Sequence, residues 1–308
     1  MKIAVYSRKR IKCDLNVIRQ VVQLLKEAKC EVALHANICN ELLKSDFERQ
    51  PDIFTNYETL KQLPDINFMM SVGGDGTFID SANIVGDLGI PLVGLNTGRI
   101  GFLAGTNRLN FKEHLQWLIN GQYEIEERSL LHLECSAPLP LQAHFALNDI
   151  TVRPSDETSI NAIRVWLNGE QVNTYWADGL IIATPTGSTA YSLSCGGPIL
   201  LPSAQVNVLT PVASHTLAVR PIVVPAHHEI KVAVESRSKK FALALDSKRV
   251  LVQNTVKLTI TPEKFTIKMV RFPEADFFTI IREKLMWGLD RRNETEKGDA
   301  DLVLPNFD

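Results

Sequence analysis

Hydrophobic and polar positions over the first 120 residues alternate between short apolar runs and longer amphipathic stretches. The short runs predict buried strands, and apolar residues spaced three or four apart predict helices. The expected strands are Ile3–Ser7, Cys30–Leu34, Asn67–Val72 and Ile90–Leu95, and the expected helices are Val17–Ala28, Thr77–Val85 and Phe111–Ile119. Strands that alternate with helices favour an α/β domain with a mostly parallel sheet.

From about Tyr123 the pattern changes to short β-branched runs separated by Pro, Gly, Asn or Asp. The expected strands are Leu130–Cys135, Ala162–Leu167, Gly179–Ala183, Ile222–Val224, Ile230–Val234 and Val256–Ile260. They predict a β-rich, β-sandwich-like second domain. We therefore expect one domain over residues 1–120 and another over residues 121–274. A helix near Phe277–Trp287 begins a C-terminal segment, residues 275–308, that we expect to return to the first domain.

Length and composition support this division, because 308 residues exceed the roughly 100–200 residues of a usual single domain. The net charge of -2 provides no overall basic field for nucleic acid or anionic lipid. The five cysteines are scattered and form no C-x-x-C pair, so they indicate reduced thiols. His215, His227 and His228 lack metal-ligating neighbours in the sequence. With no signal-like start and no long apolar run, we expect a cytoplasmic protein without membrane contact.

The most informative short segment is Val72–Phe78, which carries three glycines in four positions between an expected strand and an expected helix. Glycine lets the backbone approach a ligand closely, so N–H groups at the helix N-terminus can point at phosphate oxygens. Asp75 within this loop is suited to ligate Mg²⁺ or to accept the proton of an attacking hydroxyl. The structural alternative is a tight turn with Asp75 as a helix cap. Neither a Walker A loop nor a strand-coupled G-x-G-x-x-G is present.

A second segment, residues 177–198, combines glycines with small hydroxylated residues behind a short strand. Its hydroxyl groups suit ribose, amide or phosphate, the small Ala190 admits close approach, and Tyr191 offers an aromatic face. Asp178 is suited to accept a hydrogen bond from an amine or hydroxyl of a ligand. The structural alternative is a Ser/Thr-rich loop that runs into a helix.

Both segments carry a family resemblance. Gly73-Gly74-Asp75-Gly76-Thr77 resembles the loop shared by NAD kinases, diacylglycerol and sphingosine kinases and 6-phosphofructokinases. The segment from Asp178 through Gly187-Ser188-Thr189-Ala190-Tyr191 to Pro198 is similar to the NAD kinase segment alone. Weaker matches are Gly94–Ala104, Arg220–Pro225 and Asp246–Lys248. Asn148-Asp149 falls where that family carries Asn-Glu, so here the carboxylate is one methylene shorter.

The resemblance implies phosphorylation of the adenosine-ribose 2′-hydroxyl of NAD, with ATP and Mg²⁺ or another divalent cation, to give NADP. It implies that Asp75 is catalytic, and that Asn148 and Asp149 lie near the nicotinamide ribose. The implied NAD-binding residues are Asp75, Gly76, Phe102, Asn148, Asp149, Asp178, Thr186, Thr189, Ala190, Tyr191, Ser192, Leu193 and Ser194. The implied donor-binding residues are Gly73, Gly74, Gly76, Thr77 and Lys248. Family resemblance also suggests a homodimer or homotetramer.

Two alternative functions stay open at this point. A lipid or small-alcohol kinase would share the glycine loop, although the Gly187–Tyr191 segment argues against it. A non-catalytic dinucleotide-binding regulator would have no need of Asp75 among phosphates. The sequence leaves open the choice between ATP and polyphosphate, the acceptance of NADH, allosteric control and the role of the charged tail Arg291–Asp308.

Overall fold

The computed structural model describes residues 1–8, 12–39, 42, 50–98, 101–103, 105–141, 143–155, 161–236, 238–274 and 276–287. The chain divides into two units, Met1–Phe272 and Pro273–Asp308. The described helix of the second unit is α7 (Phe277–Leu285), which confirms the helix expected there. The tail Arg291–Asp308 lies outside the described residues, as do Arg99, Ile100 and Ala104 of the weaker family match.

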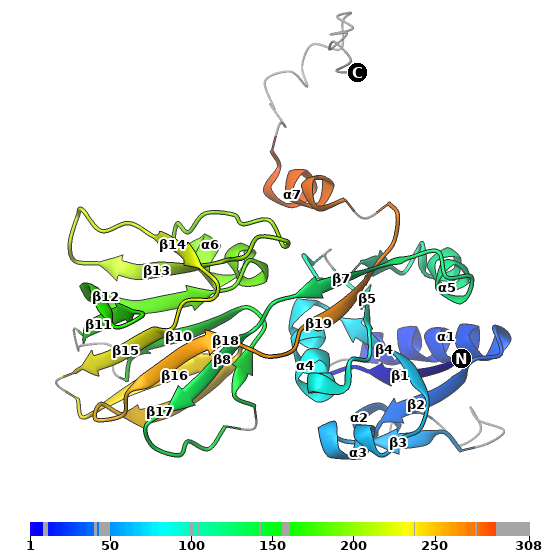
Figure 1. Ribbon diagram of the computed structural model, residues 1–308. Helices are drawn as coiled ribbons and strands as arrows, with labels where there is room; N and C mark the ends of the chain where they lie inside the picture. The colour runs from blue at the N-terminus through cyan, green and yellow to red at the C-terminus, as the bar shows by residue number, and fades with distance from the viewer. Residues whose placement is uncertain are drawn as a thin grey trace, which may run out of the picture. The chain divides into compact units, whose positions relative to one another are not determined.

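The N-terminal part of the first unit forms an eight-stranded sheet in the order β3-β2-β1-β4-β5-β19-β7, with β6 paired to β5 (Figure 1). Its strands are β1 (Lys2–Tyr6), β2 (Glu31–His35), β3 (Asp52–Phe54), β4 (Ile66–Gly73), β5 (Leu92–Asn96), β6 (Thr106–Asn107), β7 (Glu124–Arg128) and β19 (Ile267–Arg271). The pairs among β1 to β6 are parallel, and β7 is antiparallel to β19. This confirms the predicted, mostly parallel α/β sheet.

Helices pack on both faces of this sheet. They are α1 (Lys12–Glu27), α2 (Ala36–Cys39), α3 (Tyr57–Lys61), α4 (Asp75–Val85) and α5 (Phe111–Ile119), with the 3-10 helix η2 (Gly86–Leu88) after α4. Alternate residues of β1 enter different cores: Ile3 packs in a cluster with residues of α1 and α5, whereas Ala4 packs in a cluster with α3 and α4. This alternation follows from the pleat of a strand that is covered on both sides.

The second sheet has eleven strands and its recorded pairings are antiparallel. The strands are β8 (Leu131–Cys135), β9 (Phe145–Ala146), β10 (Asp149–Pro154), β11 (Asn161–Leu167), β12 (Glu170–Ala183), β13 (Val206–Ser214), β14 (Ile222–Pro225), β15 (Ile230–Glu235), β16 (Lys240–Leu245), β17 (Lys248–Gln253) and β18 (Leu258–Pro262). Two short helices, η3 (Thr186–Thr189) and α6 (Tyr191–Ser194), follow β12. The β-rich character expected for this part of the chain is thus confirmed, with its strands in one continuous sheet.

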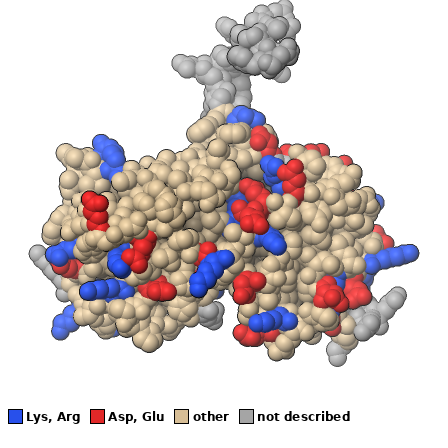
Figure 2. Space-filling model, in the orientation of Figure 1, with Lys and Arg blue, Asp and Glu red and all other residues tan. Residues whose placement is uncertain are grey.

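The described surface carries charges of both signs. Figure 2 shows Lys and Arg side chains interspersed with Asp and Glu over the visible face, in keeping with the net charge of -2. Among the described residues, no helix is long and apolar enough to cross a membrane.

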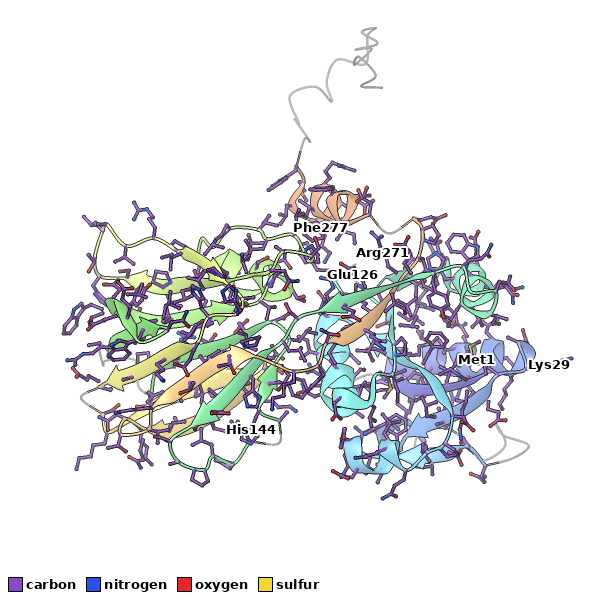
Figure 3. The ribbon with its side chains drawn as sticks, viewed as in Figure 1. Met1, Lys29, Glu126, His144, Arg271 and Phe277 are labelled. Atoms are coloured by element: carbon purple, nitrogen blue, oxygen red, sulfur yellow. The ribbon has the colours of Figure 1, made fainter. Side chains whose placement is uncertain are left out.

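The chain returns to the first sheet in β19, after the second sheet is complete. Glu126 of β7 pairs with Met269 of β19, and Arg271 forms an ion pair with Glu124. Figure 3 labels Glu126 and Arg271 on these neighbouring strands. The prediction that a C-terminal segment returns to the first domain is thereby confirmed, because β19 joins the first sheet. The boundaries 1–120 and 121–274, and the packing of residues 275–308, stay predictions.

Candidate active site

The glycine loop lies at the carboxyl edge of the first sheet, between β4 and α4. The order in which successive strands are added to the sheet reverses between β1 and β4. From β1 the chain continues to β2 on one side, and from β4 it continues to β5 on the other. In open α/β sheets ligands bind at such a reversal, outside the carboxyl ends of the strands. The segments that follow β1 and β4 therefore flank the expected ligand position.

Close packing explains the first glycine of this loop. A Cβ on Gly73 would collide with the Thr77 side chain, and the φ of Gly73 is +156°. Gly74 is the N-cap of α4, is exposed, and makes no side-chain capping bond. The first amides of α4 thus have no side-chain cap at the N-cap position, which suits a helix N-terminus that receives an anion.

Asp75, the first residue of α4, is held by the segment that follows β5. Phe102 N–H donates to Asp75 Oδ2 at 2.8 Å, and Leu103 N–H donates to Oδ1 at 3.1 Å. A Cβ on Gly101 would overlap the Asp75 carboxylate. The Gly-Phe-Leu segment that the sequence singled out therefore orients Asp75 through its backbone, and Phe102 itself is half-buried.

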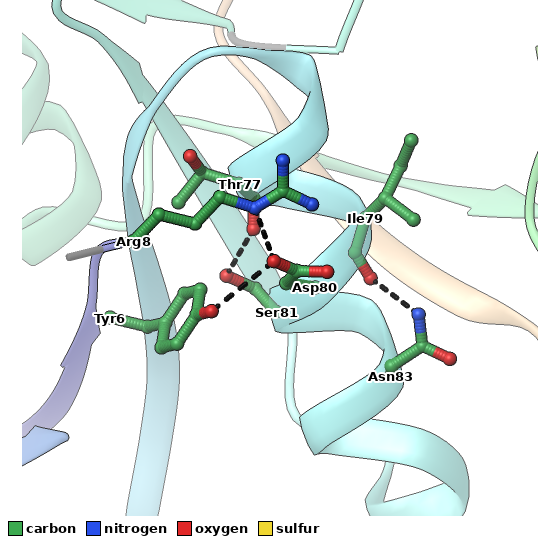
Figure 4. A network of polar contacts seen from close by, with 7 residues as sticks. All are labelled: Tyr6, Arg8, Thr77, Ile79, Asp80, Ser81 and Asn83. Carbon is green, nitrogen blue, oxygen red and sulfur yellow. Dashed lines mark hydrogen bonds and ion pairs between the residues drawn. The ribbon is translucent and has the colours of Figure 1, made fainter. Parts of the chain in front are cut away.

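One turn further along α4, Asp80 joins the glycine-loop helix to the end of β1 (Figure 4). The Arg8 Nε donates to Asp80 Oδ2, and the Tyr6 hydroxyl donates to the same oxygen at 3.3 Å. Burial and the neighbouring Asp80 raise the pKa of Tyr6 to about 12, so its hydroxyl stays protonated at neutral pH. The same carboxylate raises the pKa of Arg8 through its hydrogen bond.

The second side of the site begins at the turn before β10. The Asp246 carboxylate accepts three backbone N–H groups of this turn, from Leu147 at 3.0 Å, Asn148 at 2.7 Å and Asp149 at 3.2 Å. Asp246 N–H in turn donates to the Asp149 carbonyl at 2.9 Å. The residue has a left-handed φ of 50°. Asp246 therefore fixes the backbone of Asn148 and Asp149.

Asp149 itself is only 6% exposed. Thr151 donates its hydroxyl to Asp149 Oδ1 at 2.8 Å. Burial, with a smaller contribution from the Asp246 carboxylate, raises the pKa of Asp149 from 3.8 to about 6. The carboxylate that stands in place of a family glutamate is thus a buried group that titrates just below neutral pH.

The Gly187–Tyr191 segment packs directly on the Asn148 turn. Thr184 N–H donates to the Asn148 carbonyl at 2.9 Å, and the Thr184 hydroxyl donates to the Leu147 carbonyl at 2.6 Å. A Cβ on Gly187 would collide with the backbone of Asn148. The two motifs are therefore one structural unit, and Gly187 is the residue that permits their contact.

Several predicted hydroxyl groups point into the protein. The Ser192 side chain is fully buried and lies 2.8 Å from Thr210 Oγ1, and Ser188 donates to the Pro185 carbonyl at 2.6 Å. Thr186 is 4% exposed and receives a hydrogen bond from Arg128 at 3.4 Å. Thr189 and Leu193 are half-buried and Ser194 is exposed. The segment thus contains buried hydroxyl groups that bond within the protein, together with residues that are partly or fully exposed to solvent.

A cavity of about 840 Å³ brings five of the predicted NAD-binding residues together: Asn148, Asp149, Asp178, Ala190 and Tyr191. Ile79 of α4 also lines it, and Ile79 shares a core cluster with Leu147. The shared cluster links the glycine-loop helix to the Asn148 turn. The Arg153 guanidinium carbon lies 6.0 Å from the centre of the Tyr191 ring.

The predicted donor-binding residue Lys248 lies away from this cavity, whereas Asp178 is an exposed part of its lining. Lys248 lines a separate cavity of about 400 Å³ with Asn83 and Phe145. Asp178 is 53% exposed at its side chain and lies 3.4 Å from His215 Nε2. Among the described residues no cluster of three His, Cys, Asp or Glu suits a metal ion.

Sequence reasoning missed four side chains that line or support the site: Arg8, Asp80, Arg153 and Asp246. Asp246 stood inside a segment with a weak family match, but only Lys248 was selected from it. Arg8 follows the first predicted strand, so the rule for carboxyl ends of parallel strands was the signal that pointed to it.

Comparison with known proteins identifies the family. Residues 5–123 match the model of the ATP-NAD kinase N-terminal domain, and residues 147–272 match that of the ATP-NAD kinase C-terminal domain. The chain belongs to the NAD kinase family. The NAD kinase of Flavobacterium psychrophilum is 40% identical over 299 residues, which cover 95% of this chain and 100% of that protein. The NAD kinase of Bacteroides fragilis is 40% identical over 298 residues, with the same coverage.

A solved NAD kinase structure agrees with this membership. The crystal structure of an NAD kinase from Archaeoglobus fulgidus in complex with ATP has a TM-score of 0.72 at 26% identity, with 93% of this chain and 99% of that chain covered. Yeast NADH kinase complexed with NADH has a TM-score of 0.83 at 21% identity, with 94% and 89% covered, and shows the shared fold. The predicted NAD kinase, a phosphotransferase, is confirmed at the level of the family.

Proposed function

We propose that the protein transfers the γ-phosphoryl group of ATP to the 2′-hydroxyl of the adenosine ribose of NAD. The O–P bond between the β,γ-bridging oxygen and the γ-phosphorus breaks, and a bond from the ribose O2′ to that phosphorus forms. The hydroxyl proton passes to Asp75, and ADP and NADP leave. The observation that carries this proposal is the joining of the glycine loop and the Asn148 turn into one site by α4 and its core cluster.

The donor side of the proposal rests on the N-terminus of α4. Its uncapped Gly74, the close packing of Gly73 on Thr77 and the reversal of strand order favour a phosphate group at this edge. The acceptor side rests on the cavity of about 840 Å³, whose volume is of the size that holds a large ligand. Asn148 and Asp178 offer polar contacts there, and Tyr191 offers a ring.

Asp75 is suited to a proton-accepting role. Its two oxygens use one acceptor site each for the N–H groups of Phe102 and Leu103. An ionised carboxylate offers about four acceptor sites, so the substrate hydroxyl still finds a place. The two backbone bonds hold the carboxylate in one orientation, and positioning is the main source of catalysis in phosphoryl transfer.

The same carboxylate fits a divalent cation. Mg²⁺ is commonly held by one or two carboxylates together with substrate phosphates. Asp75 at the uncapped N-terminus of α4 provides such a donor, whereas Asp80 is engaged by Arg8 and Tyr6. When bound, Mg²⁺ neutralises charge on the donor phosphates.

The exposed apolar side chains around β12 to β14 favour assembly into a homodimer or homotetramer. They are Trp176, Leu217, Ile222 and Val223, with exposed fractions of 53%, 93%, 38% and 43%. Large exposed apolar side chains are a feature of association surfaces, which supports the proposed assembly. We also propose that the protein is cytoplasmic.

The test is direct. Purified protein is incubated with NAD, ATP and Mg²⁺, and NADP is measured with an NADP-specific dehydrogenase, which requires the 2′-phosphate. Parallel reactions replace ATP by polyphosphate, NAD by NADH, and NAD by diacylglycerol. NADP formed in the first reaction supports the proposal. Phosphorylated lipid without NADP, or NAD binding without product, would instead favour a lipid kinase or a regulator.

A further inference from the structure

We propose that Arg8 binds the polyphosphate chain of the donor nucleotide, with Asp80 and Tyr6 as the residues that position it. This inference rests on the proposed function, since it names a further donor-binding residue of the same site.

Topology brings Arg8 to the glycine loop. β1 and β4 are adjacent parallel strands, and Tyr6 at the end of β1 pairs with Ser71 near the end of β4. Arg8 lies two residues after β1 ends at Tyr6. Gly74 lies one residue after β4 ends at Gly73. Both segments leave the sheet at the edge where strand order reverses, which is the edge that receives ligands in open α/β sheets.

The Arg8 guanidinium lies against the first turn of α4. A Cβ added to Gly76 would be 2.7 Å from Arg8 Nη1 and 3.3 Å from its Cζ. Gly76 therefore leaves space for the guanidinium beside the amides that are proposed to face the donor. The Arg8 side chain is 36% exposed, so it is open to a ligand from solvent.

A cation in this place has an electrostatic cost. The N-terminus of a helix carries a partial positive charge and favours anions, so a guanidinium beside it is repelled. Asp80 offsets part of this repulsion through its contact with the Arg8 Nε. A phosphate group bound between the helix N-terminus and the guanidinium would interact favourably with both, and the fork of donors on arginine matches phosphate oxygens.

Asp80 and Tyr6 fix the direction of Arg8. A guanidinium has five N–H donors, and the bond to Asp80 uses the one at Nε. The terminal nitrogens are thereby turned toward Gly76, on the loop side. The hydroxyl of Tyr6 bonds the same Asp80 oxygen at 3.3 Å and limits its rotation. Among the described residues this places a positioned cation at the loop, whereas Lys248 lines a different cavity.

The experiment compares four proteins: wild type, Arg8→Ala, the double variant Arg8→Ala/Asp80→Asn, and Arg164→Ala as a control. Arg164 pairs with Glu235 on an exposed surface of the second sheet, so its loss removes an arginine away from the loop. Steady-state kinetics give the KM for ATP and the KM for NAD. Calorimetry with tripolyphosphate alone measures binding without turnover.

We expect both Arg8 variants to raise the KM for ATP about 10- to 100-fold, the range for one charged hydrogen-bonding contact. The KM for NAD should change by less than about twofold, and tripolyphosphate binding should weaken in parallel. The double variant removes the uncompensated Asp80 charge. If it restores the KM for ATP to the wild-type value, Arg8 merely neutralises Asp80 and the proposal is wrong.

Unchanged ATP kinetics in all variants would also overturn the inference while leaving NADP formation intact. If Arg8→Ala does not fold by thermal melting, Arg8→Gln retains a polar contact to Asp80 without the charge, and the same rise is expected. If the wild type makes no NADP, the proposed function fails. The tripolyphosphate titrations still decide the role of Arg8 in that case, because they need no acceptor.

Discussion

Phe102 donates its backbone N–H to Asp75 across 2.8 Å, so a loop after β5 holds the carboxylate at the first turn of α4. Leu103 N–H bonds the other oxygen. Asp75 is 27 positions from Phe102 and 28 from Leu103, yet the three residues form one hydrogen-bonded arrangement. Neutralising Asp75 therefore changes both the proton acceptor and the loop that orients it.

Asp75→Asn should lower kcat by about 100-fold or more, the range for loss of a general base. In asparagine an NH₂ group replaces one carboxylate oxygen and cannot accept a hydrogen bond. One of the two bonds from the Phe102 and Leu103 N–H groups is therefore lost. The fold should persist, because Asp75 is half-buried and outside the main core. Turnover of NAD and a melting curve are the measurements. Full activity in a folded variant would remove Asp75 from the mechanism.

Gly187→Ala should lower the free energy of unfolding by about 1–3 kcal/mol or more, as overpacking does in a tight site. The added methyl group would meet the carbonyl and Cα of Asn148, which are backbone atoms with no side-chain freedom to yield. Gly98→Ala is the matched control, since a Cβ there meets nothing within 4 Å. Urea unfolding of both variants checks this. Equal stability of the two would show that the Asn148 turn yields easily.

Asp149 makes stability depend on pH. Its pKa is raised from 3.8 to about 6 in the folded protein, so folding favours the protonated form. The stabilisation of the wild type relative to Asp149→Asn is thus fully present below about pH 4 and is lost as pH rises through about 6. The difference in pKa corresponds to roughly 3 kcal/mol. Asp246 contributes, because its nearby carboxylate disfavours the charge on Asp149.

Urea unfolding of both proteins between pH 4 and pH 8 measures this effect. Asp149→Asn should gain stability relative to the wild type as the pH increases over that interval. Two stability curves that run parallel across the whole interval would show that Asp149 ionises in the folded protein as it does in the unfolded chain.

Tyr191→Ala and Ser192→Ala should separate a ligand contact from a structural hydroxyl. Tyr191 lines the cavity, so its loss should raise the KM for NAD about tenfold, the lower end of the range for stacking of a base on an aromatic ring. Ser192 is fully buried and lies 2.8 Å from Thr210 Oγ1, so its loss should cost about 1 kcal/mol of stability with an unchanged KM. A higher KM for Ser192→Ala alone would reverse these roles.

Local sequence patterns predicted those elements in which the apolar residues are also the buried ones. β1, β2, β4 and β5 were expected from apolar runs, and α5 was expected with the observed bounds. β7 was missed because four of its five residues are charged, and its pairing with β19 links positions more than 130 residues apart. β13 contains Pro211, a residue type that disfavours a strand prediction; it pairs with Leu180 of β12 and lies beyond the stretch that pairs with β14.

For the site, the sequence identified the loops but could not give the direction of each side chain. A run rich in hydroxyl groups looks the same whether a hydroxyl faces a ligand or, like that of Ser192, bonds inside the protein. The contact between Asp246 and the Asn148 turn joins residues about 98 positions apart, and only the pairing of β10 with β16 brings them together. Periodicity and local spacing carry no such information.

The position of β19 between β5 and β7 has a consequence for synthesis of the protein. When the ribosome has released Arg128, β7 has been made, but its recorded partner is a strand that is still more than 130 residues away in the message. The strands of the second sheet must emerge first, and the first sheet closes only after Arg271 has left the exit tunnel. A nascent chain that stops after β18 would have the glycine loop, but β5 would lack its β19 partner at Leu92. The first sheet can therefore be completed only after the whole of the second sheet has been translated.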